Sequence, residues 1–500
     1  MNIRRFYFQM IVMSEPTYPL PRGSDNSKQL LHRLSTRIAQ SASAWSLAAT
    51  FFRVGALLFV LPFIIRTLQP EVLGLWYVFL SVGSLTGLLD LGFNPTMTRA
   101  VAYVWGGAQE LQPEGLKTIE GETGKDRAMG LPPNFALLSR LTSTMSFYYR
   151  ILAGITLLAM LTLGSWWIWH QTESLHARTS LRGAWIIFSL STALNMSGSL
   201  WPALLSGING VRQAQQLYVL SLAANYGVIA IGLACHLGLW SLVLGQLLLG
   251  LIQRQGGRLW FRALTQEGMV GVPSFAGVDR ALLQTLWPMS WRNGLVSLAG
   301  YAILNANTLI CSAFLGLAQT ASYGLSMQVS AFIASVSLIG VQVKFPLIHQ
   351  LRAQNRLDDI ARLFSGRMRL MVALYLAGAL SALFLGGSIL SAIGTKTPLL
   401  PTPLLGTLLF FYFLEMHYHQ YGTLIVSENT MPILIPFLLT GIGVVAASLL
   451  LAPHFGMWGL ILAFGIVPLC FNDWWIVLRG IRGLNWRAAA YLKLFFQITR

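Results

Sequence analysis

The sequence predicts an all-α polytopic membrane protein in which twelve transmembrane helices form two pseudo-symmetric six-helix bundles. Three observations lead to this prediction. Hydrophobic residues make up 55% of the 500-residue chain, charged residues only 10%, and apolar stretches of membrane-spanning length recur along it. Soluble domains carry roughly 25% charged residues, and a membrane helix needs about 20 apolar residues. We therefore expect much of the apolar surface to face lipid.

The apolar stretches define the helices and the segments that connect them. The predicted spans are 41–65, 73–98, 148–170, 184–206, 217–236, 239–254, 285–311, 318–343, 370–391, 403–426, 432–452 and 457–478. They divide the chain into a basic tail at 1–40, an N-terminal bundle at 41–263, a linker at 264–284, a C-terminal bundle at 285–478 and a second tail at 479–500. The division between the fifth and sixth spans depends on the short sequence His236-Leu237-Gly238.

The distribution of basic residues predicts the orientation of the chain. Most of the 34 lysines and arginines lie in the two tails and in the loops on the same side as the tails. The opposite loops hold only Arg66, Arg178, Arg182 and Lys396. By the positive-inside rule both termini are expected in the cytoplasm. The longest inner loop, 104–147, is rich in acidic residues and glycine and is expected to be a mobile surface loop.

Composition and motifs exclude several classes of function. The net charge of +17 does not indicate nucleic-acid binding, because the charges lie at the ends of apolar stretches, as topological anchors do. The three cysteines are far apart in apolar segments, which excludes a disulfide framework or a metal-binding knuckle. The sequence contains no ATP-binding Walker motif and no HExxH zinc motif, and the short outer loops hold no paired carboxylates. We therefore expect a protein that moves a substrate without converting it, and that uses no cofactor.

An internal repeat relates the two halves. The sequence from His236 to Leu242, HLGLWSL, recurs as HFGMWGL from His454 to Leu460. Each copy falls between the last two helices of a six-helix half. Because six helices return the chain to its starting side, the halves would be parallel repeats, a design that places a transport path between two bundles.

Two arginines within the predicted helices are the main candidates for substrate binding. Arg53 lies at the midpoint of the first span, and Arg292 lies about two turns into the seventh. Each costs roughly 2.5–3.5 kcal/mol at a helix centre on insertion scales. One interpretation is a cationic cavity for a diphosphate or an acidic sugar, since a guanidinium matches phosphate oxygens. The other is a structural ion pair for Arg53 and a side chain that reaches the headgroups for Arg292. Asn305 and Asn307, further along the seventh span, either bind sugar hydroxyls or bridge helices.

Acidic residues within the spans are candidates for ion coupling. Glu415 lies near the centre of the tenth span, and Tyr412 and His419 are expected on the same helix face. A buried carboxylate beside a histidine can exchange a proton or hold Na⁺, whereas the alternative is that Glu415 neutralises an arginine of its bundle. Asp90 and Arg99 lie in the inner half of the second span around Pro95, which can kink the helix and form a hinge. Asp90 is either a further coupling group or part of a local ion pair or cap beside that hinge.

Several segments resemble the polysaccharide transporters, including the O-antigen flippases, of the multidrug/oligosaccharidyl-lipid/polysaccharide (MOP) exporter superfamily. The similar segments are LLDLGFNPTMTR at 88–99, PLIHQLRA at 346–353 and FGMWGL at 455–460. The likeness covers roughly residues 40–480. It implies two MATE-like bundles that alternate between inward and outward openings in a bacterial inner membrane. It also implies a cationic cavity for an undecaprenyl-diphosphate-linked oligosaccharide and coupling to H⁺ or Na⁺.

The function expected from the residues and the resemblance is a flippase for such a lipid-linked oligosaccharide, an O-antigen or exopolysaccharide repeat unit. Its partners would be membrane lipids and the polymerase and glycosyltransferases of the same pathway. One alternative is a MATE-type antiporter that exchanges a drug or metabolite for a cation. The other is a membrane-embedded glycosyltransferase or polymerase, which the short outer loops disfavour.

Overall fold

The computed structural model describes residues 42–111, 132–175, 177–266, 268, 270, 277–428 and 432–496, and it is helical in every regular element of these ranges. The predicted tail at 1–40 and the middle of the 104–147 loop lie outside the described residues. The end of that predicted loop is wrong, because 135–147 is the first part of a helix that continues into the third span. Eight stretches within the described ranges are both long and apolar enough to cross a membrane. The all-α membrane fold predicted from hydropathy is confirmed.

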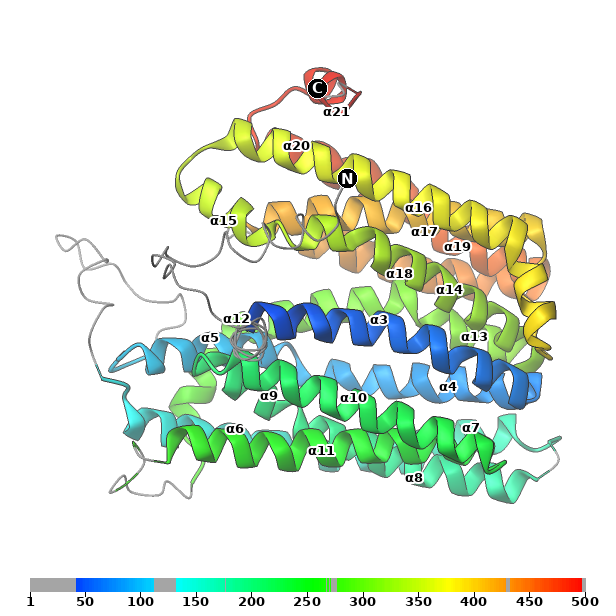
Figure 1. The fold of residues 1–500 in the computed structure, drawn as a ribbon, viewed down its shortest axis with the longest axis horizontal. Helices are drawn as coiled ribbons and strands as arrows, with labels where there is room; N and C mark the ends of the chain where they lie inside the picture. The colour runs from blue at the N-terminus through cyan, green and yellow to red at the C-terminus, as the bar shows by residue number, and fades with distance from the viewer. Residues whose placement is uncertain are drawn as a thin grey trace, which may run out of the picture.

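The N-terminal bundle contains the first six predicted spans, several of them broken into consecutive helices. Its elements are α3 (Ala42–Thr67), α4 (Pro70–Thr86), η1 (Gly87–Asp90), α5 (Phe93–Trp105), α6 (Phe135–Ala159), η2 (Met160–Gly164), α7 (Ser165–Gln171), α8 (Arg178–Gly198), α9 (Leu200–Gly207), α10 (Val211–Ala234) and α11 (Leu239–Thr265). In Figure 1 these helices form the lower half of the molecule and run along its long axis.

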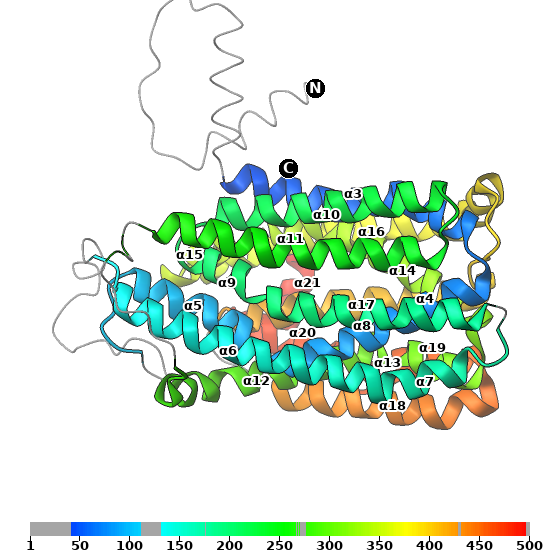
Figure 2. The ribbon, with the colours of Figure 1, turned by 90° about the horizontal axis from the view of Figure 1, so that it is seen from below.

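The C-terminal bundle contains the other six spans. Its elements are α12 (Arg280–Leu304), α13 (Ala306–Phe314), α14 (Leu317–Gln342), α15 (Phe345–Ala353), α16 (Leu357–Ile393), α17 (Thr402–Val426), α18 (Leu434–Phe455), α19 (Met457–Cys470) and α20 (Asn472–Arg482). A further short helix, α21 (Ala488–Phe496), packs on α16 and α20. Figure 2 shows the long helices of both bundles running along a common axis. We call the end that bears α15 the inner end, since the charge pattern predicts it to be cytoplasmic.

The backbone supports the internal repeat found in the sequence. Gly238 joins α10 to α11 with φ 57° and ψ −128°, and Gly456 joins α18 to α19 with φ 57° and ψ −131°. Residues with a Cβ rarely adopt this conformation, so glycine is required at both turns. The matching turns join matching helix pairs, and the predicted division between the fifth and sixth spans is confirmed at this point.

The hydrophobic cores show that α12 is shared between the bundles. Leu282 and Leu286, in its inner half, lie in a core formed with α5, α6 and α9 of the N-terminal bundle. Ala299 and Ile303, in its outer half, lie in the core of the C-terminal bundle. The helix therefore crosses from one bundle to the other along its length.

Candidate functional site

The two bundles meet along a seam formed by α4, η1 and α5 on one side and by α12, α13 and α14 on the other. In its outer half the Tyr77 hydroxyl donates a hydrogen bond to Gln328 Oε1 at 2.6 Å. Leu317 and Leu325, from the outer half of α14, join the core of the N-terminal bundle, whereas Val341, from its inner half, lies in the C-terminal core. Contact through α14 is therefore concentrated at the outer end.

The middle of the seam lies at a helix break. Asn305 separates α12 from α13, and its backbone carbonyl accepts a hydrogen bond from Ser81 Oγ at 2.9 Å. The Tyr301 hydroxyl donates to the Ser81 carbonyl at 3.2 Å. A helix break exposes carbonyls that would otherwise bond within the helix, and here one is used across the seam. The sequence analysis expected the side chain of Asn305 either to bind sugar hydroxyls or to bridge helices; the contact seen here is made by its backbone carbonyl, and the role of the side chain stays a prediction.

The inner half of the seam is a close contact between glycines. A Cβ added to Gly294 would lie 2.8 Å from Leu91 Cα, and one added to Gly92 would lie 2.6 Å from the Ser290 carbonyl oxygen. Real Cβ atoms are essentially never found so near a backbone atom. The approach of α12 to the second span therefore requires glycine on both sides.

Pro95 begins a helix rather than bending one. The second span breaks at Leu91 and Gly92, whose φ angles of 49° and 71° are both left-handed. Helix α5 starts at Phe93, which places Pro95 in the first turn, where the backbone N–H groups have no intrahelical partner. The proline therefore costs no hydrogen bond there, and the kink expected at this residue occurs at the preceding pair.

Asp90 lies at the same break. Its Oδ2 accepts a hydrogen bond from the Asn94 backbone N–H at 3.1 Å, and its Oδ1 accepts one from the Tyr149 hydroxyl at 2.5 Å. Arg99 is exposed and makes no ion pair with Asp90. These contacts are those expected if Asp90 caps the start of α5. A role for Asp90 in ion coupling stays a prediction.

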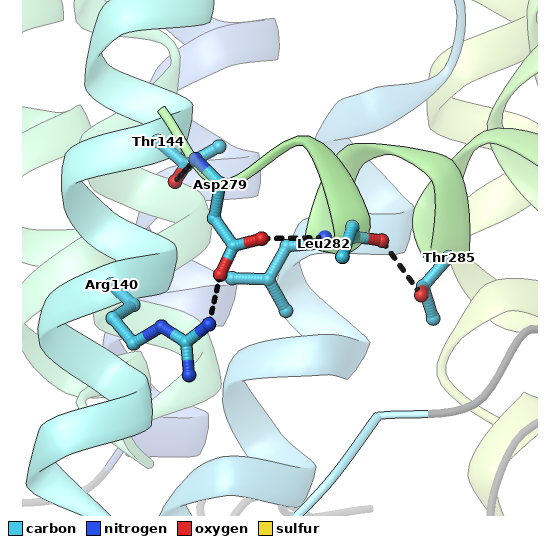
Figure 3. A network of polar contacts seen from close by, with 6 residues as sticks. Arg140, Thr144, Asp279, Leu282 and Thr285 are labelled. Atoms are coloured by element: carbon cyan, nitrogen blue, oxygen red, sulfur yellow. Dashed lines mark hydrogen bonds and ion pairs between the residues drawn. The ribbon is translucent and has the colours of Figure 1, made fainter. Parts of the chain in front are cut away.

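The inner end of α12 is held to α6 by polar contacts (Figure 3). Asp279 is the N-cap residue of α12, and its Oδ1 accepts from the Leu282 backbone N–H at 3.2 Å. Its Oδ2 pairs with Arg140, and its backbone N–H donates to Thr144 Oγ1 at 3.0 Å. One buried aspartate therefore caps the helix and attaches it to the other bundle. The expected linker at 264–284 thus contains the first turn of α12.

Glu415 belongs to a buried polar cluster inside the C-terminal bundle. Its side chain is buried in α17, and its Oε2 accepts a hydrogen bond from the Tyr418 hydroxyl at 2.5 Å. His419, expected beside it, is exposed and faces the ring of Phe437. On a helix, Glu415 can reach both Tyr418, three residues on, and His419, four residues on. In the folded protein it contacts Tyr418.

Helix α20 completes this cluster with two residues that the sequence analysis did not select. Asn472 is fully buried, and neither its amide nitrogen nor its amide oxygen has a hydrogen-bond partner in the structure. Asp473 lies on the same helix, which packs against α17, and has a buried Oδ1 that also lacks one. Both lie just past a helix break at Phe471, close to Pro468. That proline beside two polar residues within a span was the signal that could have identified them.

The remaining expected site residues lie in different surroundings. The backbone of Arg53 belongs to α3, but its side chain lies outside the described residues. Arg292 is exposed on α12, with its guanidinium 5.7 Å from the ring centroid of Trp291, and it pairs with no acidic side chain in the described ranges. Asn307 is buried within the C-terminal bundle, where its Nδ2 donates to the Leu460 carbonyl at 3.3 Å. The substrate-binding roles of all three stay predictions.

Solved structures share this arrangement of two six-helix bundles. A multidrug resistance MATE family transporter of the MOP superfamily, in an inward-facing conformation, has a TM-score of 0.62 and 12% identity over 87% of this chain and 95% of its own. The MATE multidrug transporter DinF-BH, solved as a complex, has a TM-score of 0.55 and 12% identity over 97% of this chain and 100% of its own. The lipid II flippase MurJ, in an inward closed conformation, has a TM-score of 0.53 and 13% identity over 90% and 89%. The chain has the MOP fold.

Comparison of the sequence with protein families and with curated proteins found no match. The MOP fold accounts for the multi-pass membrane architecture and for the paired bundles. The seam along α12 and the buried cluster around Glu415 are two places where polar groups meet between helices in the described part of the chain. In the described residues no group of three histidine, cysteine, aspartate or glutamate side chains is arranged to hold a metal ion.

Proposed function

We propose that the protein is a flippase that carries an undecaprenyl-diphosphate-linked oligosaccharide across the bacterial inner membrane by alternating access between its two bundles. The observation that carries this proposal is the exposed guanidinium of Arg292 on the seam helix α12, which has no acidic partner in the described ranges. A cation at this position within a membrane span is costly unless it meets water or an anion. A diphosphate-linked substrate supplies such an anion.

The seam supports a rocking motion. Its polar contacts are a few directional hydrogen bonds, such as those of Tyr77 with Gln328 and of Ser81 with Asn305. Each contributes about 0.5–1.5 kcal/mol, so these hydrogen bonds alone do not hold the outer end closed. Helix α14 contacts the N-terminal bundle at the outer end of the seam. The structure therefore corresponds to a conformation in which the two bundles are closed at the outer end.

Glu415 is proposed to couple transport to an ion gradient. It lies with Asn472 and Asp473 in a cluster that provides carboxylate and amide oxygens but no basic partner within the described ranges. Buried oxygens without donors can hold a proton or a monovalent cation. Binding there would stabilise one packing of α17 against α20 over another and so bias the bundle.

The main test compares two arginines of the same helix. Arg292→Ala is expected to abolish flipping of the lipid-linked oligosaccharide in proteoliposomes, while Arg280→Ala, an exposed arginine at the first position of α12, keeps it. Inward-facing lipid-linked glycan should accumulate in cells that express only Arg292→Ala. Flipping at the wild-type rate by Arg292→Ala would rule out the proposed role of this cation.

A MATE-type antiporter is the second candidate, because a MATE transporter structure superposes with a higher TM-score than the MurJ structure does. The buried carboxylate Glu415 is also suited to a cationic drug. Measuring sensitivity of a deletion strain to toxic organic cations separates the two candidates. Increased sensitivity with normal surface glycan would favour the antiporter.

A further inference from the structure

A second group of arginines lies at the inner end of the C-terminal bundle, away from the seam. Arg352 is in the last turn of α15, Arg479 is in α20, and Glu428 follows the end of α17. Arg352 Nη1 lies 3.4 Å from Glu428 Oε1, and Arg479 Nη2 lies 3.1 Å from Glu428 Oε2. We infer that Arg352 and Arg479 form a binding site for a phosphate group at the inner surface of the membrane.

The charge of the group points to an anion. One carboxylate faces two guanidinium groups, which leaves one positive charge uncompensated. The side chain of Arg352 is only 15% exposed and that of Glu428 only 17%, whereas that of Arg479 is 36% exposed, so solvent screens the charge of Arg352 least. A partly buried cation without full compensation is costly, and a bound anion removes that cost.

The free donors of Arg352 have the geometry that a phosphate requires. Its Nε and Nη2 are buried and have no hydrogen-bond partner in the structure. These two atoms form one edge of the guanidinium, and they donate in parallel to two oxygens of the same phosphate. Glu428 occupies only Nη1, and it does so at a long distance. The edge best suited to bidentate phosphate binding is therefore the one left free.

The surroundings hold this edge in place. Ile348 and Leu351, on the same short helix, are buried in the C-terminal core and fix α15. A Cβ added to Gly483 would lie 2.1 Å from Glu428 Oε1, so the backbone after α20 lies directly against the carboxylate. Glu428 therefore lies between that backbone and the two arginines. Because the side chains are fixed before a ligand arrives, binding orders few new groups.

The ligand class is a phosphate oxyanion, either the phosphodiester of an anionic lipid headgroup or free inorganic phosphate. A lipid bound here would contact α15, α17 and α20, which come together at this end of the bundle. The site is separate from the seam, and it does not depend on the transport proposed above.

The experiment measures binding to the full-length protein purified in a neutral detergent. Native mass spectrometry follows phosphatidylglycerol, with diacylglycerol as the phosphate-free lipid, and thermal unfolding follows added inorganic phosphate. Arg352→Lys keeps the charge but lacks the paired donors, so it should weaken phosphatidylglycerol or phosphate binding by about tenfold. The control, Arg356→Gln, removes a neighbouring surface arginine that is 58% exposed and pairs with Asp359, and it should bind as the wild type does.

The outcomes distinguish a lipid headgroup from free phosphate as the ligand, and they can show that the site does not bind phosphate. Binding of phosphatidylglycerol without competition from phosphate identifies a lipid headgroup, and stabilisation by phosphate alone identifies a soluble anion. Glu428→Gln, which removes the competing carboxylate, should strengthen binding. Equal binding by Arg352→Lys and the wild type, or an equal loss in Arg356→Gln, overturns the inference.

Discussion

Asp279 and Arg140 join the two bundles at the inner end of α12, although 139 residues separate them in the chain. The same aspartate is the N-cap of α12, and this helix places Leu282 and Leu286 in the N-terminal core (Figure 3). The inner half of α12 is thus attached to one bundle and its outer half to the other. Motion between the bundles must therefore bend or tilt α12.

Asp279 should contribute to stability through two separable interactions. Asp279→Ala removes both the cap and the ion pair and is expected to lower the free energy of unfolding by about 1–2 kcal/mol. Asp279→Asn keeps a good capping side chain and loses only the charge, so its effect should be smaller. Unfolding of the purified variants in detergent measures both. Equal losses in the two variants would show that the cap contributes nothing.

Tyr77→Phe removes one hydroxyl from the outer half of the seam. The lost hydrogen bond to Gln328 contributes about 0.5–1.5 kcal/mol to the closed outer end, so the outward-open population should rise by up to about tenfold. Electron paramagnetic resonance distances between spin labels at Glu173 and Ser388, which are exposed in the outer parts of the two bundles, would report this shift. An unchanged distance distribution would exclude a gating role for this contact.

Gly294→Ala tests the close glycine contact against a control on the same helix. Its Cβ would lie 2.8 Å from Leu91 Cα, whereas a Cβ at Gly300 would meet no atom within 4 Å. Overpacking of this kind costs typically 1–3 kcal/mol, so Gly294→Ala should lower the unfolding temperature and slow transport. Gly300→Ala should change neither by a comparable amount. Similar behaviour of the two variants would show that the contact is not tight.

Glu415→Gln tests ion coupling with little change in shape. The amide keeps an oxygen that accepts from the Tyr418 hydroxyl, while the group can no longer exchange a proton or neutralise a cation. Transport should lose its response to a pH or Na⁺ gradient, while binding of the cargo is retained. Flux into proteoliposomes under imposed gradients measures the response. A gradient response equal to that of the wild type would remove Glu415 from the coupling mechanism.

Much of the fold was predictable because membrane burial depends on contiguous sequence. A run of about 20 apolar residues is stabilised in lipid whatever its neighbours are, so hydropathy located the spans. The division at His236-Leu237-Gly238 was placed correctly because only glycine permits the backbone angles of that turn. Its repeat at Gly456 has nearly the same angles, which a sequence comparison within the chain could detect.

The partners of the polar residues were less predictable, because they come from distant parts of the chain. Helical spacing put both Tyr418 and His419 near Glu415, and only packing selected the tyrosine. Asn472 and Asp473 were missed because the helix break at Phe471 buries them against α17.

The sequence by itself determined the helical spans, their repeat and their expected orientation, since these follow from local hydropathy, glycine turns and loop charge. The tertiary structure decided which bundle each part of α12 belongs to. The sequence analysis assigned the seventh span, 285–311, to the C-terminal bundle and left Leu282 in the linker, but Leu282 and Leu286 both pack in the N-terminal core. That choice depends on close contacts such as those of Gly92 with Ser290 and of Gly294 with Leu91, where the absence of side chains on both helices lets their backbones approach. No pattern within a single helix encodes such a match.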